Sequence, residues 1–387
     1  MRKKITQNDE PAPPKATKEA VLASTQDAME LVRTKVIDFS FNELYDMYRS
    51  DELEINPAYQ RLFRWGIAKQ SQFIESLILE LPIPPIYVVE EEGGKYELID
   101  GLQRFSSYLH LRGMLKKDGQ TQPPLILEGC DILKQLNGLT YDDLPTPIQI
   151  RLKRMSVPVQ VLRKESDRRL RYHMFKRLNT GGEALSEQEV RNATIRLLGD
   201  RFNNFIQELA KHEDFALCVD LMTDEQKDRM VREECVLRFF AFKNDFANYH
   251  KLITPFLDDF MERMTDGPEA ETFDYAHEAS VFRQTFSLFA TTTRDQTFST
   301  VTKSNTLGNQ FSMAHYDMLT QGVQKHLNKL ITLNGNDRGA LGEQIIALKK
   351  DKKFRQDTTG GGKNYKSAYR NTIEYVEKWI ARWLRTA

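Results

Sequence analysis

The chain has 387 residues, of which 40% are hydrophobic and 28% are charged, and its 55 Lys and Arg balance its 55 Asp and Glu. A formal net charge of zero excludes a molecule that attracts nucleic acid through its overall charge, although local basic surfaces stay possible. No apolar run approaches the roughly 20 residues of a membrane span, and the N-terminus lacks the apolar core of a secretory signal. We therefore expect a cytoplasmic protein with no membrane partner and with two domains.

The N-terminal 36 residues are polar and rich in proline near their start. Such a composition buries too little apolar surface to fold alone. Residues 1–36 are therefore predicted to form a disordered tail and linker, with a weak helix at most over 21–36.

The three cysteines, Cys130, Cys218 and Cys235, are scattered along the chain. They show none of the paired spacings that bind zinc. We expect buried, inert thiols of a protein in a reducing compartment.

The first half of the chain alternates helical and strand patterns. Apolar residues from Phe73 to Leu81 recur at helical spacing and stop at Pro82. Two β-prone runs then flank Gly93-Gly94, which predicts a hairpin, and a helix is expected from Leu102. The other expected elements of this half are a helix over 41–53, a loop-rich insertion over 114–147, a strand over 155–164, a helix over 167–178, and a helix opened by the capping box of Ser186 and Glu189.

Beyond residue 200 the sequence is helical in composition and period. The clearest helix is the last one, where an apolar stripe that includes Tyr369, Val376 and Ile380 faces charges on the other side. The expected fold is α+β, with an α/β domain over 37–200 followed by an all-α domain over 201–387.

A polar turn lies where the strand ending at Asp100 meets the following helix. A helix N-terminus presents unpaired N–H groups, and Gly101 would let a phosphate approach them closely. Arg104 adds a planar donor fork, Gln103 could orient water or a phosphate oxygen, and Asp100 could hold Mg²⁺ or polarise water. These residues are typical of a nucleoside triphosphate site, while a simple turn with an Asp cap and a surface arginine is the alternative.

Two other stretches carry similar chemistry. Gln60 and Arg61 precede the first long helix among aromatic residues, and Asn179 begins an Asn-Thr-Gly-Gly turn that leads to another helix. Turns of one α/β sheet often converge on a ligand crevice. The residues expected to contact a nucleotide are Gln60, Arg61, Gly101, Arg104, Asn179, Thr180 and Gly181.

Four motifs follow one another in this half: P-x-Y-Q-R, ESLILELPIPPIY, YELIDGLQR and FKRLNTGGEALSEQEVRNA. Because of these four motifs in this order, residues from about 37 to 200 resemble the DUF262 family. That family includes the N-terminal domain of GmrSD-type modification-dependent restriction enzymes. The resemblance implies a ParB/sulfiredoxin-like fold. It also implies a D-G-Q-Q-R motif, associated with nucleotide binding and hydrolysis in phage-defence proteins, on Asp100, Gly101, Gln103 and Arg104. Leu102 replaces the first glutamine, and no cysteine for sulfiredoxin chemistry occupies the turn.

The resemblance leads to a nucleotide-binding, NTP-hydrolysing protein of a phage-defence or restriction system. Asp100, Gln103 and Arg104 would be catalytic, Mg²⁺ on Asp100 the cofactor, and DNA and a nuclease or other effector subunit the partners. None of the seven histidines lies in an HNH nuclease pattern, so no built-in nuclease is expected. A non-enzymatic DNA-binding module, favoured by Leu102, is the alternative, and a direct DNA nickase is a third.

The C-terminal end is basic. From Lys349 to Ala387, eleven Lys and Arg stand against four Asp and Glu, in a chain whose total is zero. Such a segment can contact nucleic-acid phosphates, or it can be a solvated helix face. The residues expected to contact DNA are Lys349, Lys350, Lys352, Lys353, Arg355 and Lys363.

Overall fold

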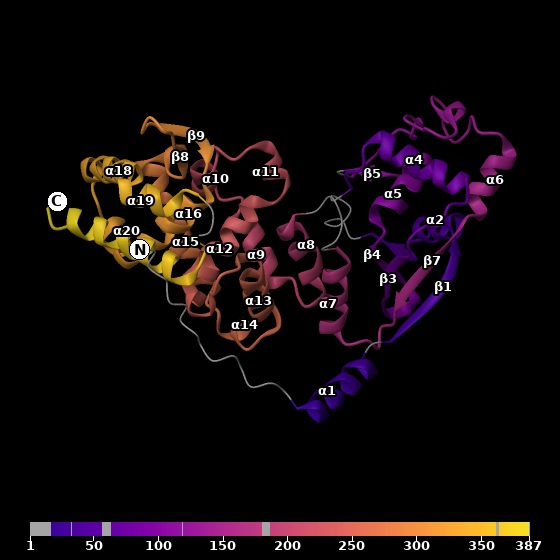
Figure 1. Ribbon diagram of the computed structural model, residues 1–387, viewed down its shortest axis with the longest axis horizontal. Coiled ribbons are helices and arrows are strands. Elements are labelled where there is room, and N and C mark those ends of the chain that lie inside the picture. The colour runs from indigo at the N-terminus through magenta and orange to yellow at the C-terminus, as the bar shows by residue number, and fades with distance from the viewer. Residues whose placement is uncertain are drawn as a thin grey trace, which may run out of the picture. The chain divides into compact units, whose positions relative to one another are not determined.

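A computed structural model describes residues 17–31, 33–55, 63–117, 119–179, 186–360 and 364–386. The chain divides into two compact units between Met174 and Phe175 (Figure 1). The first unit is mixed α/β and the second is mainly helical, which confirms the expected α+β class. The division lies before the predicted boundary at residue 200, so the last predicted helix of the first domain belongs to the helical unit.

The α/β unit is built on a five-stranded sheet with the strand order β1-β7-β3-β4-β2. Its strands are β1 (Thr34–Ser40), β2 (Leu53–Glu54), β3 (Ile86–Glu90), β4 (Tyr96–Asp100) and β7 (Ser156–Leu162). β3 and β4 form the predicted antiparallel hairpin, and η1 (Glu92–Gly94) lies at its turn. β7 lies parallel to β3 and antiparallel to β1.

Strand β1 corrects the N-terminal prediction. It starts inside the region that we expected to be linker, and it follows α1 (Lys18–Leu31). β1 is an edge strand and its side chains are exposed or half-buried, so its sequence lacks a clear apolar alternation. Pairing with β7 along its whole length, rather than its own pattern, defines this strand.

Helices α2 (Phe41–Arg49), α4 (Ile67–Ile78), α5 (Leu102–Leu111) and α6 (Thr146–Arg154) group together beside the sheet (Figure 1). Their fully buried residues, each 0% exposed, include Phe41, Ile74, Leu77, Phe105 and Tyr108. The helical spacing of these residues explains why the periodic segments fold as helices that cover one core.

The insertion between α5 and α6 is loop-rich, as predicted. Its regular elements are β5 (Lys116–Lys117), β6 (Gln120–Thr121) and η2 (Lys134–Leu136). The buried carboxylate of Glu75 on α4 accepts the backbone N–H groups of Ile132 at 3.0 Å and of Leu133 at 2.5 Å. These charge-assisted bonds fix an irregular segment to a helix.

Helix α7 (Arg168–Asn179) leads into the helical unit, where α8 (Glu187–Thr194) begins at the predicted capping box of Ser186 and Glu189. The other elements are η3 (Ile195–Leu197), α9 (Arg201–Leu209), α10 (Glu213–Cys218), α11 (Asp224–Asp228), α12 (Val231–Asp245), η4 (Phe246–Asn248), α13 (Ile253–Asp266), α14 (Glu269–Thr272), α15 (Tyr275–Thr292), η5 (Arg294–Gln296), β8 (Ser299–Val301), β9 (Leu307–Phe311), α16 (Met313–Gly322), η6 (Gln324–His326), α17 (Leu327–Leu330), α18 (Gly335–Lys350), α19 (Lys352–Thr358) and α20 (Lys366–Trp383). The β8–β9 hairpin is the strand content that the all-α prediction missed.

The core of the helical unit combines aromatic packing with a buried ion pair between α12 and α16. Arg238 on α12 binds Asp317 on α16 through two hydrogen bonds, and the Tyr369 hydroxyl of α20 donates to the same carboxylate at 3.1 Å. The predicted stripe of α20 is confirmed, because Tyr369, Val376 and Ile380 are buried.

All three cysteines are buried and free, as expected. Burial raises the pKa of Cys130 to about 11 and that of Cys218 to about 12, so both thiols stay protonated at neutral pH. None of the helices in the described part of the chain is long and apolar enough to cross a bilayer.

Candidate functional site

The predicted strand–turn–helix arrangement is present at residues 100–104. β4 ends at Asp100, Gly101 has a φ of +101°, and α5 begins at Leu102. A Cβ atom on residue 101 would lie 2.9 Å from Cγ1 of Ile86 on β3. Glycine is therefore required here twice, by the left-handed backbone and by the close approach of the neighbouring strand.

Asp100 and Arg104 form an ion pair across this turn, with 2.9 Å between Oδ2 and Nη2. Nη1 of Arg104 also donates to the carbonyl oxygen of Pro85 at 3.1 Å and to that of Pro84. The Arg104 side chain is only 13% exposed and that of Asp100 is 29% exposed. The guanidinium therefore joins the proline-rich segment before β3 to the start of α5.

Gln103 holds the segment that precedes α4. Its Oε1 accepts the backbone N–H groups of Arg64 at 3.0 Å and of Trp65 at 3.1 Å. The carbonyl of Trp65 in turn accepts a bond from Gln70 Nε2 at 2.6 Å, and Gln70 Oε1 lies 2.7 Å from Nδ1 of His110. A chain of polar contacts thus runs from the turn to the far end of α5.

Burial lowers the pKa of His110 at that far end. A neutral imidazole can donate from one ring nitrogen and accept at the other. His110 is therefore a hydrogen-bonding partner of Gln70 at neutral pH rather than a cation.

Leu102, at the position where the D-G-Q-Q-R motif has its first glutamine, is 3% exposed. Its side chain is part of the core of the α/β unit and does not line the polar turn. The first residue of α5 therefore supports the turn by packing.

The N-terminus of α5 has the features of an anion site. No side chain hydrogen-bonds to its cap, and the helix of ten residues begins at a glycine. Its first N–H groups and the positive end of its dipole lie beside the Asp100–Arg104 pair.

Several predicted site residues lie outside the described part of the chain. These are Gln60, Arg61, Thr180, Gly181 and Lys363. Asn179 is the last residue of α7, and its side chain is also outside the described part. The expected convergence of Arg61 and Asn179 on Asp100 stays a prediction.

The motif that contains Asn179 also supplies a buried ion cluster in the helical unit. Nζ of Lys176 lies 2.7 Å from Asp258 Oδ2, and Nε of Arg191 lies 2.5 Å from Oδ1 of the same carboxylate. Sequence reasoning missed Arg191 and Asp258, because they are 67 residues apart and no local pattern joins them.

Lys349 requires a correction among the residues expected to contact DNA. Its side chain is 0% exposed, and Nζ donates to Ser299 Oγ at 2.7 Å and to the carbonyl of Gln296. Burial, with the charge of Lys350 as a smaller cause, lowers the pKa of Lys349 to about 7. Lys349 is a core residue of the helical unit and not part of a basic surface.

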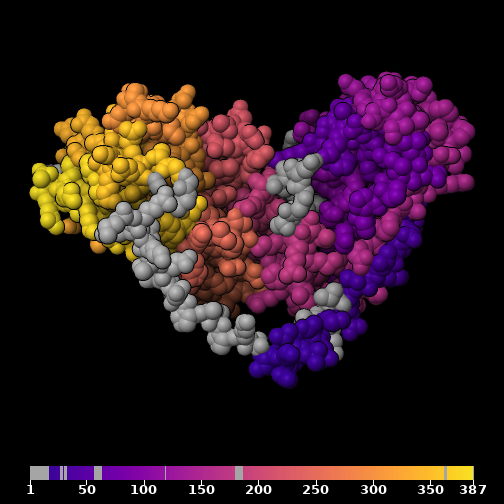
Figure 2. All heavy atoms as spheres, in the orientation of Figure 1, coloured from indigo at the N-terminus to yellow at the C-terminus, as the bar shows by residue number. Residues whose placement is uncertain are grey.

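In the basic stretch after Lys349, α19 occupies residues 352–358. Lys352 and Lys353 are exposed, although Lys353 pairs with Asp357 at 2.8 Å. Arg355 is half-buried and donates to the carbonyl of Thr302 at 2.9 Å. The C-terminal segment, yellow in Figure 2, still forms part of the outer surface of the helical unit.

No group of three or more His, Cys, Asp or Glu is placed to hold a metal within the described ranges. Mg²⁺ in nucleotide sites is usually held by one or two carboxylates together with the substrate phosphates. Asp100, at a partly exposed strand end, fits that pattern as a single oxygen ligand.

Comparison with known proteins gives one match. Residues 41–196 match the family model described as the GmrSD restriction endonuclease, N-terminal domain. No curated protein and no solved structure matches the chain. The matched range includes the whole 100–104 turn and α8, and it ends before the basic C-terminal segment.

Proposed function

We propose that the β4–α5 turn, which lies within the residues that match the GmrSD restriction endonuclease N-terminal domain, binds and hydrolyses a nucleoside triphosphate in a restriction or phage-defence system. The observation that carries the proposal is the left-handed Gly101 at an uncapped helix N-terminus, next to Asp100 and Arg104. Phosphate groups bind readily at such a terminus, because N–H groups and the helix dipole both favour negative charge.

Arg104 supplies the first phosphate contact in this proposal. Its guanidinium makes three hydrogen bonds to described residues, to Pro84, Pro85 and Asp100. An arginine has five N–H donors, so two are left to point elsewhere. The bonds to the two carbonyls hold the fork in one orientation, which reduces the entropy that a phosphate must overcome on binding.

Gln103 supports the proposed site indirectly, by holding a neighbouring segment. Because its Oε1 already accepts two backbone N–H groups, its role is to hold residues 64 and 65 against the turn.

Asp100 is the proposed group for orienting the attacking water. Its carboxylate is partly exposed and directly precedes the glycine at which phosphates would enter. Asp100 would also hold Mg²⁺, which neutralises developing charge on the phosphates when it is bound. Because Leu102 is a core residue, orientation of water falls to Asp100 and not to a glutamine at that position.

The test is a panel of ATP, GTP, CTP and UTP, scored with the full chain for binding by calorimetry and for release of inorganic phosphate. Asp100→Asn should abolish phosphate release while binding survives. Arg104→Gln should weaken binding about 10- to 100-fold, the loss expected for a charge-assisted phosphate contact. Arg151→Gln, which breaks an exposed pair with Glu80 in the same unit, is the matched control and should change neither.

A second candidate is a DNA-binding module that does not hydrolyse nucleotides. It is favoured by the buried leucine at position 102 and by the exposed Lys352 and Lys353. Under this alternative, no nucleotide of the panel is hydrolysed and DNA binding is independent of nucleotide. DNA and a nuclease or other effector subunit are the partners that we propose for either case.

A further inference from the structure

The β8–β9 hairpin of the helical unit has a buried base and an exposed polar tip (Figure 1). At the base, Phe298 and Ser299 are 0% exposed, and the backbone N–H of Ser312 donates to the carbonyl of Phe298 at 2.8 Å. The buried amine of Lys349 also donates to Ser299 Oγ at 2.7 Å. The core of the unit therefore fixes the direction in which the hairpin leaves it.

The tip of the hairpin, residues 302–306, is held together by its own polar groups. The backbone N–H of Thr302 donates to the carbonyl of Thr306 at 2.8 Å, and the hydroxyl oxygens of these two residues lie 2.7 Å apart. Asn305 has a φ of +63°, in the left-handed region that asparagine tolerates better than most residues. Because the tip is already ordered, a ligand that binds it loses little conformational entropy.

Arg355 joins this tip to α19. Its Nη2 donates to the carbonyl of Thr302 at 2.9 Å, and its Nη1 donates to Asn305 Oδ1 at 3.1 Å. Residues three positions apart on a helix lie on the same face. Lys352, three positions before Arg355, therefore lies on the face of α19 that meets the hairpin. We call the tip and this face of the helix the hairpin–α19 surface.

The hairpin–α19 surface carries cations that have no acidic partner. Lys303 at the tip and Lys352 are both exposed, and in the described part of the chain neither side chain forms an ion pair or a hydrogen bond. Hairpin residues 299–311 contain no Asp or Glu. The acids of the α19 segment are engaged elsewhere, because Asp351 caps the helix and Asp357 pairs with the lysine four positions before it. Like charges gathered on one surface repel each other, and a polyanion relieves that repulsion.

The other side chains of the hairpin favour nucleic acid over an acidic protein as this polyanion. Hydroxyl and amide groups such as those of Ser304 and Asn309, both exposed, are common donors to phosphate oxygens. The core of a protein–protein interface is apolar and rich in aromatic residues. None of the large apolar residues in 299–311 is exposed, so the hairpin offers a protein partner no such core.

We propose that the hairpin–α19 surface binds the phosphate backbone of DNA, with Lys303 and Lys352 each contacting a phosphate. The inference rests on the DNA partner proposed above and extends the contact from one helix to the β8–β9 hairpin. It does not depend on nucleotide hydrolysis at the β4–α5 turn, since the two sites share no residue.

The test is a titration of a fluorescently labelled DNA duplex of about 30 base pairs with the full chain, followed by anisotropy at several salt concentrations. Lys303→Gln should weaken binding about three- to tenfold and should lower the slope of log affinity against log salt by about one, because each phosphate contact releases about one counterion. Lys303→Glu should weaken binding further. An unchanged urea midpoint confirms that these variants at an exposed tip are folded.

Lys329→Gln is the matched control. Lys329 is an exposed lysine of α17 in the same unit, it forms no ion pair with any residue that the structure describes, and it belongs to neither the hairpin nor α19. Its substitution should change neither the affinity nor the salt slope.

The outcomes separate this inference from the proposal on which it rests. Absence of duplex binding by the unaltered chain would overturn both. Binding that Lys352→Gln weakens and Lys303→Gln leaves unchanged would overturn the contact through the hairpin and leave DNA as a partner. Polyglutamate that displaces the labelled duplex as effectively as unlabelled duplex does would overturn the assignment of this surface to nucleic acid.

Discussion

Gln103 and Trp65 are 38 residues apart in the chain, yet the side-chain oxygen of Gln103 accepts the backbone N–H of Trp65 at 3.1 Å. The same oxygen accepts the N–H of Arg64. A residue that the motif places in a nucleotide site thus acts first as a clamp on the neighbouring segment. The N-terminal end of α5 therefore both forms the proposed nucleotide site and holds residues 64 and 65 in place.

The contribution of the two hydrogen bonds that Gln103 accepts from residues 64 and 65 can be tested by substituting Gln103. Gln103→Leu removes the acceptor and leaves two partly buried N–H groups without it, which should lower the free energy of unfolding by about 1–3 kcal/mol. Gln103→Glu keeps an acceptor oxygen and should retain most of the stability. Urea denaturation of both variants measures the difference, and equal stability of the two would show that the clamp contributes nothing.

Leu102→Gln separates packing from catalysis. The D-G-Q-Q-R pattern invites the expectation that a glutamine here would improve hydrolysis, but Leu102 is 3% exposed in the core. Burying an amide without partners should destabilise the protein by about 1–3 kcal/mol. Leu102→Met, which conserves volume, should cost under about 1.5 kcal/mol. Thermal unfolding measures the stability of both variants, and an assay of phosphate release measures their hydrolysis. A Leu102→Gln variant that is as stable as the parent and hydrolyses nucleotide faster would contradict the packing role.

Lys349 gives the helical unit a specific pH dependence. Its pKa is about 7 in the folded protein and has its ordinary value, near 10.4, in the unfolded chain. Between these values the unfolded chain binds more protons, so the free energy of unfolding should rise as the pH increases from about 7 to 10. Lys349→Met should raise the urea midpoint at pH 7 and flatten the profile in this window.

The control for this profile is Lys352→Met, which removes an exposed lysine two positions past the end of α18. It should shift neither the midpoint nor the slope. If Lys349→Met instead lowers the midpoint at pH 7, the hydrogen bonds of its amine to Ser299 and Gln296 outweigh the penalty of burying a charge.

Among the residues proposed to contact DNA, Lys352 and Lys353 are exposed in the structure and can be tested directly. Lys352→Gln combined with Lys353→Gln should weaken DNA binding for all sequences alike and decrease the dependence of affinity on salt, because each phosphate contact releases counterions. Electrophoretic shift titrations at several salt concentrations measure both effects. Lys325→Gln, at a 68% exposed lysine of the same unit, is the control. An unchanged salt slope in the double variant would point to a protein partner for this segment.

Local patterns predicted the parts of the fold that depend on neighbours in the chain. The hairpin at Gly93-Gly94, the strand–glycine–helix turn at 100–104 and the capping box at Ser186 each follow from a few adjacent residues. β1 was missed because an exposed edge strand has no strong alternation, and pairing with β7 defines it.

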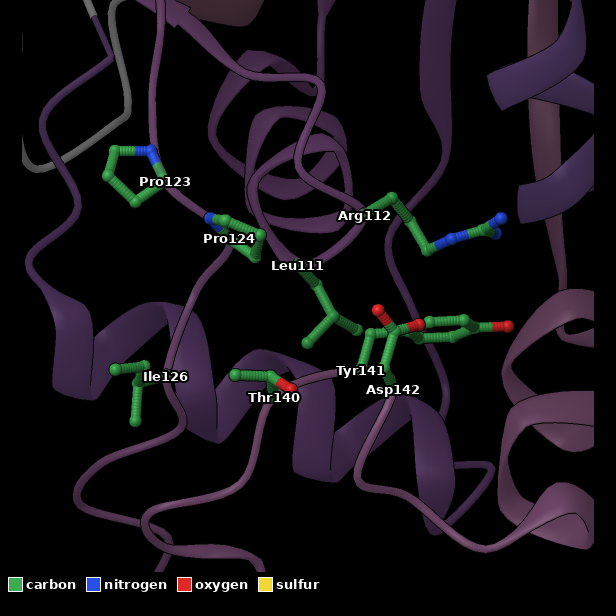
Figure 3. A pocket seen from close by; sticks show the side chains of 8 residues that line it. All are labelled: Leu111, Arg112, Pro123, Pro124, Ile126, Thr140, Tyr141 and Asp142. Carbon is green, nitrogen blue, oxygen red and sulfur yellow. The ribbon is translucent and has the colours of Figure 1, made fainter.

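The chemistry of individual side chains was harder to predict, since it depends on residues distant in sequence. Lys349 resembles its basic neighbours in the sequence, and only its hydrogen bond to Ser299, 50 positions away, identifies it as a core residue. Likewise, nothing local distinguishes Arg112 from other surface arginines. Its fixed position follows from Tyr45 and Tyr141, which lie 67 positions before it and 29 after it, and Figure 3 shows its side chain alongside that of Tyr141.

Helix α5 has the turn at one end and Arg112, stacked between Tyr45 and Tyr141, at the other. His110 and Gln70 connect the same two ends by hydrogen bonds. Trp65 and Gln70 thus hold both ends of α5, so a ligand that binds at the turn acts on a helix whose far end is fixed by the same neighbours.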